Sequence, residues 1–447
     1  MTEKSIKIRQ GLDLQLDGGA APIVEPYATS RYYVRPSDFR WMTPQLLVRE
    51  GDSLSVGTPL FADKRDPRVR VCSPVGGVLS QVVRGDKRRI LALVINADEV
   101  QSCSSAVEVP DNPSPRQIRD ILLQYGLWPV LRQRPFSVIA DPDGTPDAIF
   151  LSCFDSAPLA PDFNVLLKGF EAEWHEGIHV LRQICHDVPI HLGLREGADN
   201  ALFERTDGVD LHYFSGPHPA GNIGTQIDCI RPLDKGDVVW YIHPWQVAAV
   251  GRLFLSHTLS YERCVALTGP AEPRPRYVAM TYGADLSSML TPDPQGRTVR
   301  NISGNVLTGS TLGEFPSVGF YDSQLTRLFE GGQREFLGWL LPGLKKWSLS
   351  HTFVAWLAKR KKFSFNTSMH GGERALVVSD VYDEVFPMDI MPAELLKACI
   401  AKDVEQMEEL GIYGVDSEDV ALCEVVCPSK IAWQQIVEEA LHYLYEN

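Results

Sequence analysis

Residues 43–96 carry the pattern that most constrains how this chain can fold. Short strands alternate there with a Gly51-Asp52 turn, a turn at Gly57 and a junction at Gly76-Gly77. The charged loop Lys64–Arg70 separates the two halves of the pattern. Short alternating strands interrupted by Gly-Asp and Gly-Gly turns are typical of small β-sandwiches and barrels. We therefore expect a compact β domain near the start of the chain.

The strand order of this segment resembles the barrel-sandwich domains that carry biotinyl or lipoyl groups. Those domains hold the group on a lysine at a tight hairpin, which raises Lys64 as a candidate for modification. Here Lys64 leads into the charged run Arg65–Arg68 instead. The resemblance therefore extends to the fold and not to the swinging-arm chemistry, and a carrier protein modified on Lys64 stays as one alternative.

From Ser114 the spacing of apolar residues changes to an alternation of helices and strands. The expected helices and strands follow a proline-rich linker and lie at 117–125, 148–153, 162–185, 189–194, 209–214, 238–242 and 245–255. Strands that alternate with helices predict a parallel α/β sheet of Rossmann type. No Gly-x-Gly-x-x-Gly follows any of these strands, so a standard dinucleotide site is not supported.

The remaining chain is first rich in strands and then helical. Residues 265–327 read as short strands separated by turns, 331–386 are irregular, and the pattern is helical beyond Pro392. We predict a multidomain α/β protein with four parts. They are a barrel-sandwich β domain (1–110), a Rossmann-like α/β domain (111–262), a small β-grasp-like module (263–330), and a linker with a C-terminal helical domain (331–447).

The net charge of −14 argues against a nucleic-acid partner. Residues 401–447 hold eleven Asp/Glu and two Lys, so nine of those negative charges lie there. No run approaches 18 apolar residues, so we expect any membrane association to be peripheral. Trp339, Trp347, Trp356 and the basic run 359–362 could dock on membrane-bound partners. The nine widely spaced cysteines are most simply reduced thiols.

The segment 421–428 contains Cys423-x3-Cys427-Pro, the second half of a ferredoxin-type cluster motif. A complete four-iron site needs two further thiolates at the preceding positions of the Cys-x2-Cys-x2-Cys-x3-Cys-Pro spacing. Ser417 and Val420 occupy these positions. Cys423 and Cys427 alone cannot hold such a cluster, so we expect no metal site here. The other reading is two ordinary buried cysteines on a helix.

A glycine-rich loop follows the expected strand that ends at Phe214. Gly216, Gly221 and Gly224 could expose backbone N–H groups to an anion, and His218 could relay a proton. Two prolines in the loop remove donors and stiffen it. The loop therefore predicts either rigid packing against a neighbouring domain or a ligand cradle. The second reading would make the chain a stand-alone soluble nucleotide-binding enzyme.

The segment 126–136 combines aromatic and guanidinium side chains. Trp128 and Phe136 flank Arg132 and Arg134. Aromatic faces and arginines suit a flat quinone head or the acidic groups of a partner. The alternative is a surface turn whose arginines pair with nearby carboxylates. No zinc spacing, nucleophile elbow or phosphate loop occurs, and we assign no catalytic residue.

Short segments along the whole chain match the sequence pattern of one known family. The sequence resembles the NqrA family, the A components of the bacterial Na⁺-translocating NADH:quinone oxidoreductases. The matching segments are Gly11–Leu14, Leu60–Lys64, Ser73–Gly77, Arg84–Arg88, Gly126–Trp128, Arg134–Ser137, Gly216–Gly221, Val250–Leu255, Ile302–Leu307, Phe336–Trp339, Pro387–Ile390 and Leu422–Pro428.

This resemblance implies a peripheral subunit on the cytoplasmic face of the bacterial inner membrane. Five other components, designated B to F, would complete the complex, with the membrane-embedded component B as the most direct partner. The complex oxidises NADH, reduces quinone and exports Na⁺. The resemblance places FAD, FMN, riboflavin and the iron–sulfur centres in the partner components, so this chain would bind no redox cofactor and would not be catalytic alone.

The resemblance also points to a quinone-proximal segment. Trp128, Arg134 and Phe136 match the family there, and Arg132 falls on a basic position of the same segment. We expect Arg132, Arg134 and Phe136 at a surface that meets the membrane components, with Trp128 supporting them from behind. The segment 31–41 could also lie near quinone but departs from the family pattern. Binding within this chain or at its contact with component B, and ubiquinone or menaquinone, stay open.

Overall fold

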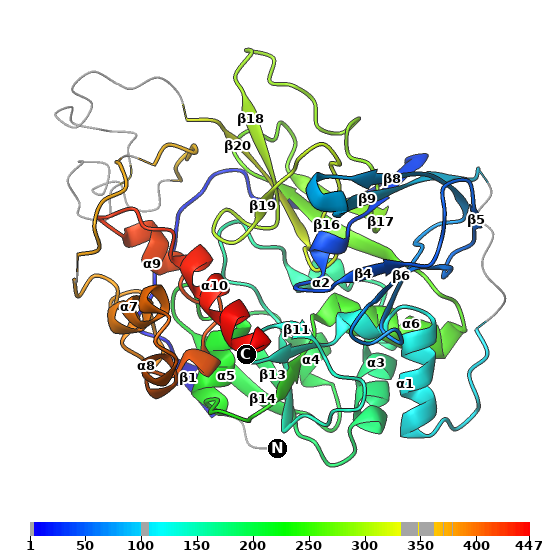
Figure 1. Ribbon diagram of the computed structural model, residues 1–447, viewed down its shortest axis with the longest axis horizontal. Coiled ribbons are helices and arrows are strands. Elements are labelled where there is room, and N and C mark those ends of the chain that lie inside the picture. The colour runs from blue at the N-terminus through cyan, green and yellow to red at the C-terminus, as the bar shows by residue number, and fades with distance from the viewer. Residues whose placement is uncertain (1–3, 100–106, 332–346, 348–361, 370, 378) are drawn as a thin grey trace.

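The computed structural model describes residues 4–99, 107–331, 347, 362–369, 371–377 and 379–447. Within these ranges the chain forms four β-sheets and a C-terminal group of helices (Figure 1). No helix in the described part is long and apolar enough to cross a membrane. Of the expected docking residues, Trp339, Trp356 and 359–361 lie outside the described ranges, whereas Trp347 contacts Phe365 with ring centroids 5.7 Å apart.

The expected β domain is present as two small sheets, in the order β3-β9-β8-β5 and β4-β6-β7. Their strands are β3 (Arg31–Val34), β4 (Pro44–Leu46), β5 (Ser53–Leu54), β6 (Pro59–Asp63), β7 (Arg70–Cys72), β8 (Gly77–Arg84) and β9 (Ile90–Ala97). Inward-facing residues such as Leu60, Val71 and Leu93 form the core. Lys64 is exposed and opens the charged loop between β6 and β7, as the sequence predicted.

The α/β part contains a seven-stranded sheet in the order β1-β14-β13-β12-β15-β10-β11. The strands are β1 (Lys4–Lys7), β10 (Arg132–Arg134), β11 (Val138–Ile139), β12 (Ala148–Ser152), β13 (Ile190–Arg195), β14 (Asp210–Ser215) and β15 (Val239–Tyr241). Strands β1, β14, β13, β12 and β15 are parallel, whereas β10 pairs antiparallel with both β15 and β11. The expected purely parallel sheet is therefore wrong at one edge, because β10 and β11 form a hairpin.

Helices cover both faces of this sheet (Figure 1). One face packs on α1 (Pro115–Gln124), α3 (Glu171–Ile184) and α6 (Pro244–Ser256) through Ile149, Leu151 and Trp240. The opposite face packs on α5 (Ile223–Ile230) through Ala148, Phe150, Val239 and Tyr241. The short helices α2 (Phe163–Leu166) and α4 (Ala201–Glu204) contribute Phe163 and Phe203 to the same core as α1, α3 and α6. This alternation of neighbouring residues between two cores follows from the two-residue repeat of a strand.

Helix boundaries in this part have local causes. Ser114 caps α1 by accepting from the Gln117 amide, while the Gln117 side chain accepts from the Ser114 amide. Helices α3 and α6 approach closely at Gly177 and Gly251. A methyl group on Gly251 would lie 1.8 Å from the Glu173 carbonyl oxygen. The absence of these two side chains therefore sets the distance between the two helices.

The strand-rich module forms a six-stranded sheet in the order β19-β18-β20-β16-β17-β2. Its strands are β2 (Ala21–Pro26), β16 (Glu262–Thr268), β17 (Arg276–Thr281), β18 (Val299–Ser303), β19 (Ser310–Thr311) and β20 (Gln324–Phe329). Strand β2 pairs with β17, and β1 pairs with β14 of the larger sheet. The first 110 residues therefore contribute strands to all four sheets.

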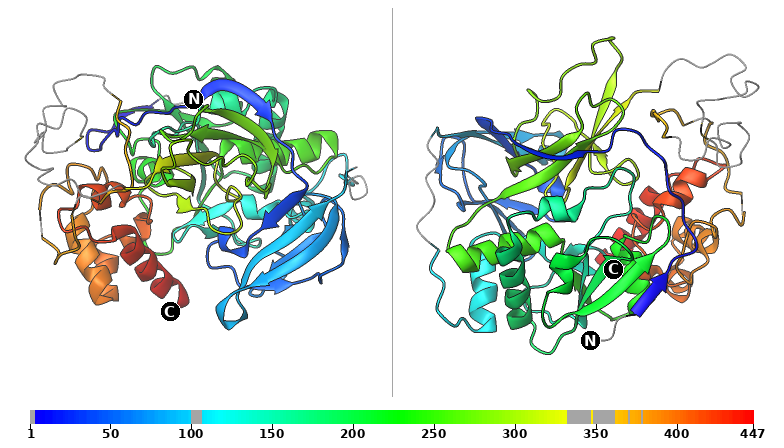
Figure 2. Two further views of the ribbon diagram at one scale, coloured as in Figure 1. Left: turned by 90° about the horizontal axis from the view of Figure 1, so that it is seen from above. Right: turned by 180° about the vertical axis from the view of Figure 1, so that it is seen from behind.

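The C-terminal helices form a separate core. They are α7 (Pro392–Ala401), α8 (Val404–Glu409), α9 (Ala421–Val426) and α10 (Trp433–Glu446). We call these helices, together with the segments that join them (residues 392–446), the helical unit. Trp433, Tyr382 and both motif cysteines are fully buried within it. Both views in Figure 2 place the unit at one end of the molecule. In Figure 1 it lies beside α5 and β1. It also contacts Arg134 of β10 and Arg40, and these contacts build the site described next.

Candidate functional site

The two arginines of β10 project from the same face of the sheet as Tyr241. Arg132 lies opposite Tyr241 in the ladder, and Arg134 lies opposite Val239. The Arg132 guanidinium stacks on the rings of Tyr241 and Tyr321, 4.4 and 4.2 Å from their centroids. Its Nη2 atom is 2.7 Å from Nε2 of His243. Burial, with the nearby Arg132 charge, lowers the pKa of His243 to about 3, so the imidazole accepts from Arg132 as a neutral group.

Trp128 lies on the opposite side of the sheet and is completely buried. Its indole Nε1 donates to the Ala140 carbonyl oxygen at 2.7 Å. The ring also makes an edge-to-face contact with Trp240, with centroids 5.6 Å apart. Trp240 is the β15 residue between Val239 and Tyr241, so it points away from the two arginines. Trp128 is thus part of the core behind the segment.

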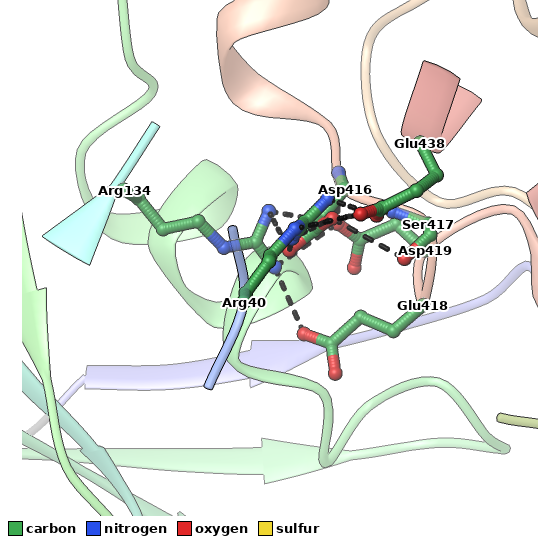
Figure 3. Close-up of polar contacts among 7 residues, drawn as sticks. All are labelled: Arg40, Arg134, Asp416, Ser417, Glu418, Asp419 and Glu438. Carbon is green, nitrogen blue, oxygen red and sulfur yellow. Dashed lines mark hydrogen bonds and ion pairs between the residues drawn. The ribbon is translucent and has the colours of Figure 1, made fainter. Parts of the chain in front are cut away.

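Arg134 does not reach the surface, which corrects the sequence expectation. Its side chain is only 1 % exposed and is enclosed by carboxylates of the helical unit (Figure 3). Nη2 donates to Glu418 at 2.8 Å, and Nη1 lies 3.3 Å from Asp419 and 3.8 Å from Asp416. Burial opposes the charged form, but Asp416, Asp419 and Glu418 outweigh it and raise the pKa of the guanidinium.

Arg40 joins the same cluster from the β domain (Figure 3). It forms two hydrogen bonds to Asp416, of 2.7 and 2.8 Å, and is also paired with Glu438 of α10. Burial raises the pKa of the Asp416 carboxyl, but Arg40 and Arg134 outweigh it and hold that pKa well below its usual range. Asp416 therefore bridges two arginines, Arg134 on β10 and Arg40 in the connection between β3 and β4.

An aromatic cluster lies beside these ion pairs. The Phe136 ring contacts Trp41, Tyr413 and Tyr445, with centroid separations of 6.4, 6.0 and 5.4 Å. Trp41 also contacts Tyr445 at 5.1 Å and His442 at 4.9 Å. Each of these five side chains is half-buried, so the cluster borders solvent. We call Trp41, Phe136, Tyr413, His442 and Tyr445 the aromatic cluster.

The backbone of this cluster is unusual. Trp41, Phe136 and Ser137 have φ angles of 54°, 81° and 51°. Bulky residues rarely adopt left-handed backbone conformations, and each such residue costs on the order of 1–3 kcal/mol. Strained residues of this kind are concentrated at binding and catalytic sites. Their coincidence with half-exposed aromatic rings marks this cluster as the best candidate for a functional surface among the described residues.

The glycine-rich loop is packed against the chain itself. An added Cβ would lie 2.1 Å from the Ile8 carbonyl oxygen at Gly216, 2.5 Å from the Ser156 nitrogen at Gly221, and 2.4 Å from Asp419 Oδ1 at Gly224. The chain therefore occupies the space in which the loop would hold an anion. These contacts favour rigid packing over the ligand cradle.

His218 is part of the same packing. It is only 3 % exposed, and its Nδ1 atom lies 3.0 Å from Ser156 Oγ. Burial lowers the pKa of this histidine to about 4, so it is neutral at physiological pH. Its amide donates to Asp13 and its carbonyl accepts from Leu12, which ties the N-terminal segment to the loop. Of the four loop residues predicted, only Gly224 adjoins the arginine cluster.

Cys423 and Cys427 are fully buried, and the Tyr382 hydroxyl lies 3.4 Å from the Cys427 sulfur. Burial raises the pKa of Cys423, so it is present as a thiol. No group of three or more metal-ligating side chains occurs in the described ranges. The motif residues act here as packing groups of the helical unit.

Sequence reasoning missed Trp41, Tyr413 and Tyr445 as members of the site, together with Arg40, Asp416 and Asp419. Trp41 does lie at the end of the segment 31–41 that was expected near quinone. The C-terminal residues gave no comparable signal, because only folding brings them to β10. A buried arginine needs carboxylate partners, and the acidic C-terminal segment was the only strongly acidic stretch available to supply them.

The barrel-sandwich domain, the α/β sheet and the helical unit define a multidomain chain whose parts meet at one shared cluster. Known family models match the chain in three consecutive stretches. They are the NqrA N-terminal barrel-sandwich hybrid domain over residues 6–98, the NqrA second alpha/beta domain over 114–259, and the NQRA C-terminal domain over 264–313.

Curated relatives match along nearly the entire length. The A component of the Na⁺-translocating NADH-quinone reductase from Pseudomonas aeruginosa PAO1 is 38 % identical over 441 residues, covering 98 % of both chains. The same component from Haemophilus influenzae Rd is 35 % identical, and that from Neisseria meningitidis MC58 is 36 % identical, with the same coverage. The chain therefore belongs to the NqrA family, the A components of Na⁺-translocating NADH-quinone reductases.

Solved structures resemble the chain only weakly. The H₂-reduced NAD⁺-reducing NiFe-hydrogenase has a TM-score of 0.39 and 13 % identity, covering 77 % of this chain and 63 % of that one. A likeness of this size supports no functional conclusion.

Proposed function

We propose that this chain is the peripheral, cytoplasmic-side component of an Na⁺-translocating NADH:quinone reductase. It supports quinone reduction coupled to Na⁺ export and binds no redox cofactor of its own. Family membership supports this assignment. The flavins and iron–sulfur centres then belong to the partner components B to F, with the membrane-embedded component B as the direct neighbour. We also propose the four-part division at residues 110, 262 and 330, with a β-grasp-like module as the third part.

The observation that carries a quinone-related role is the aromatic cluster around Phe136. A quinone head is flat and apolar on its faces, so it stacks on aromatic rings. Phe136 and Trp41 offer such faces at the border with solvent and are held in strained backbone conformations. Arg134 and Arg132 lie behind these rings. Arg134 is paired with Asp419 and Glu418, and Arg132 stacks on Tyr241.

Photolabelling of the assembled complex tests this placement. A quinone carrying a photoreactive group on its ring should label peptides that contain Trp41, Phe136, Tyr413 or Tyr445, and excess unlabelled quinone should suppress the labelling. Label confined to the other components would remove this cluster from the quinone site.

No observation favours the alternative of a stand-alone nucleotide-binding enzyme. Its only candidate loop, 216–224, is filled by Ile8, Ser156 and Asp419.

A further inference from the structure

The helical unit is joined to the rest of the chain by an ion cluster with excess negative charge. Two arginines, Arg40 and Arg134, face four carboxylates, those of Asp416, Glu418, Asp419 and Glu438 (Figure 3). All four carboxylates come from the helical unit, and both arginines come from the other side of the contact. The Glu418 and Glu438 side chains are 37 % and 36 % exposed and stay solvated, so a proton taken up by the cluster goes to one of the two buried aspartates.

Asp419 is the most deeply buried of the four carboxylates. Its Oδ2 atom accepts from Arg134, with both Nη atoms at 3.3 Å, and from the Asp416 amide at 2.9 Å. Its Oδ1 atom is buried and has no hydrogen-bond partner among the described residues. The side chain is 1 % exposed, and Gly224 of α5 packs directly against Oδ1. An ionised carboxylate oxygen in such a position would be both desolvated and unpaired.

We propose that Asp419 is a proton-binding residue whose neutral form holds the helical unit on the α/β sheet. The proposal goes beyond the quinone role of the aromatic cluster and does not depend on it. Because Tyr413 and Tyr445 belong to the helical unit and contact Phe136, docking of the unit also completes that cluster.

The groups that face Asp419 support this assignment. Burial raises the pKa of Asp419 to about 7, against Arg134, and the like charges of Glu418 and Asp416 add to the rise. The surrounding charged and titratable groups, taken element by element, are Arg132 and Arg134 on β10, Tyr241 on β15, Arg40 after the turn at 36–38, Glu438 on α10, Asp155 after β12, and Asp416 and Glu418 on its own loop. Helix α5 contributes the uncharged Gly224 at this point.

The sign of the pH effect follows from the raised pKa. In the undocked state Asp419 is solvated and returns toward its ordinary value of 3.8. Docking therefore takes up a proton between about pH 4 and pH 7. Over this window the equilibrium constant for undocking rises by up to about tenfold per pH unit. Above pH 7 the contribution of Asp419 to this constant no longer changes.

Hydrogen exchange read by mass spectrometry on the full chain tests the proposal. The opening equilibrium of peptides within 404–446, corrected for the intrinsic exchange rate, is compared at pH 5, 6, 7 and 8. Asp155 and Asp228 also make the opening equilibrium depend on pH, because burial raises the pKa of each to about 6. The decisive quantity is therefore the difference between the wild-type chain and Asp419→Asn, which is neutral at every pH.

In the wild-type chain the equilibrium constant for opening should rise about a hundredfold from pH 5 to pH 7. In Asp419→Asn this rise should be smaller by about tenfold for each pH unit. Glu405→Gln, an exposed carboxylate on α8, should behave as wild type. An equal slope in Asp419→Asn and wild type would overturn the proposal. If Asp419→Asn does not fold, the profile is measured in the chain that carries Asp155→Asn and Asp228→Asn, in which a rise between pH 5 and pH 7 would support the proposal and a flat profile would overturn it.

Discussion

Replacing Arg134 by methionine should detach or destabilise the helical unit. The arginine is 1 % exposed and faces Glu418, Asp419 and Asp416 at 2.8, 3.3 and 3.8 Å. Methionine fills much of the volume but removes the arginine that pairs with the buried Asp419 and with Glu418, and it leaves Asp416 with Arg40 alone. Removing one partner of a buried ion pair costs about 3–5 kcal/mol. The opening equilibrium of the helical unit should therefore rise by roughly a hundred- to a thousandfold or more.

The measurement is urea unfolding of the full chain, followed by hydrogen exchange in peptides of 404–446. Arg300→Met is the matched control, because Arg300 makes a similar two-bond pair with Glu330 but is 40 % exposed. An exposed pair is worth at most about 1 kcal/mol. Combining Arg134→Met with Asp416→Asn should cost less than the sum of the single changes, because both belong to one network. An effect of Arg134→Met no larger than that of Arg300→Met would refute the buried contact.

Two further outcomes follow from the same contact. Gly224→Ala should weaken docking of the helical unit by about 1–3 kcal/mol, because its Cβ would lie 2.4 Å from Asp419 Oδ1. Gly313→Ala is the control, since its Cβ would meet no atom of the described residues within 4 Å, and it should be neutral in the same exchange assay. Asp416 has a lowered pKa, so its stabilising effect is complete above its ordinary value of 3.8 and is lost as the pH falls below it. Protection of the helical unit should therefore fall between pH 4 and pH 2 in wild type and show a smaller fall in Asp416→Asn.

The sequence predicted those elements whose signals are local. The Gly-Asp and Gly-Gly turns located the strands of the β domain, and apolar periodicity located β12 and α6 near their observed bounds. The helix expected over 162–185 is divided into α2 and α3 by residues 167–170. The pairing of strands with one another could not be predicted from local sequence patterns. Lys4–Lys7 and Ala21–Pro26 have no local pattern that tells which sheet they join, because that choice is made by packing far along the chain.

The candidate site was predictable in part. Composition pointed to the segment 126–136, and Phe136 does lie in a half-exposed aromatic cluster. The orientation of Arg134 could not be read from the sequence, because an arginine suits a surface as well as a buried acidic pocket. Only the fold reveals that Asp416, Glu418 and Asp419, almost 300 residues along the chain, enclose it.

Steady-state kinetics of the assembled complex carrying Phe136→Ala tests the central claim most directly. We predict a raised KM or lowered turnover for quinone, with NADH oxidation by artificial acceptors unchanged, because only the quinone step would use this ring. Leu307→Ala, a partly buried side chain that also packs on the helical unit, serves as the control for loss of packing alone. Unchanged quinone kinetics in a fully assembled Phe136→Ala complex would contradict the account and leave the chain with a scaffold role only.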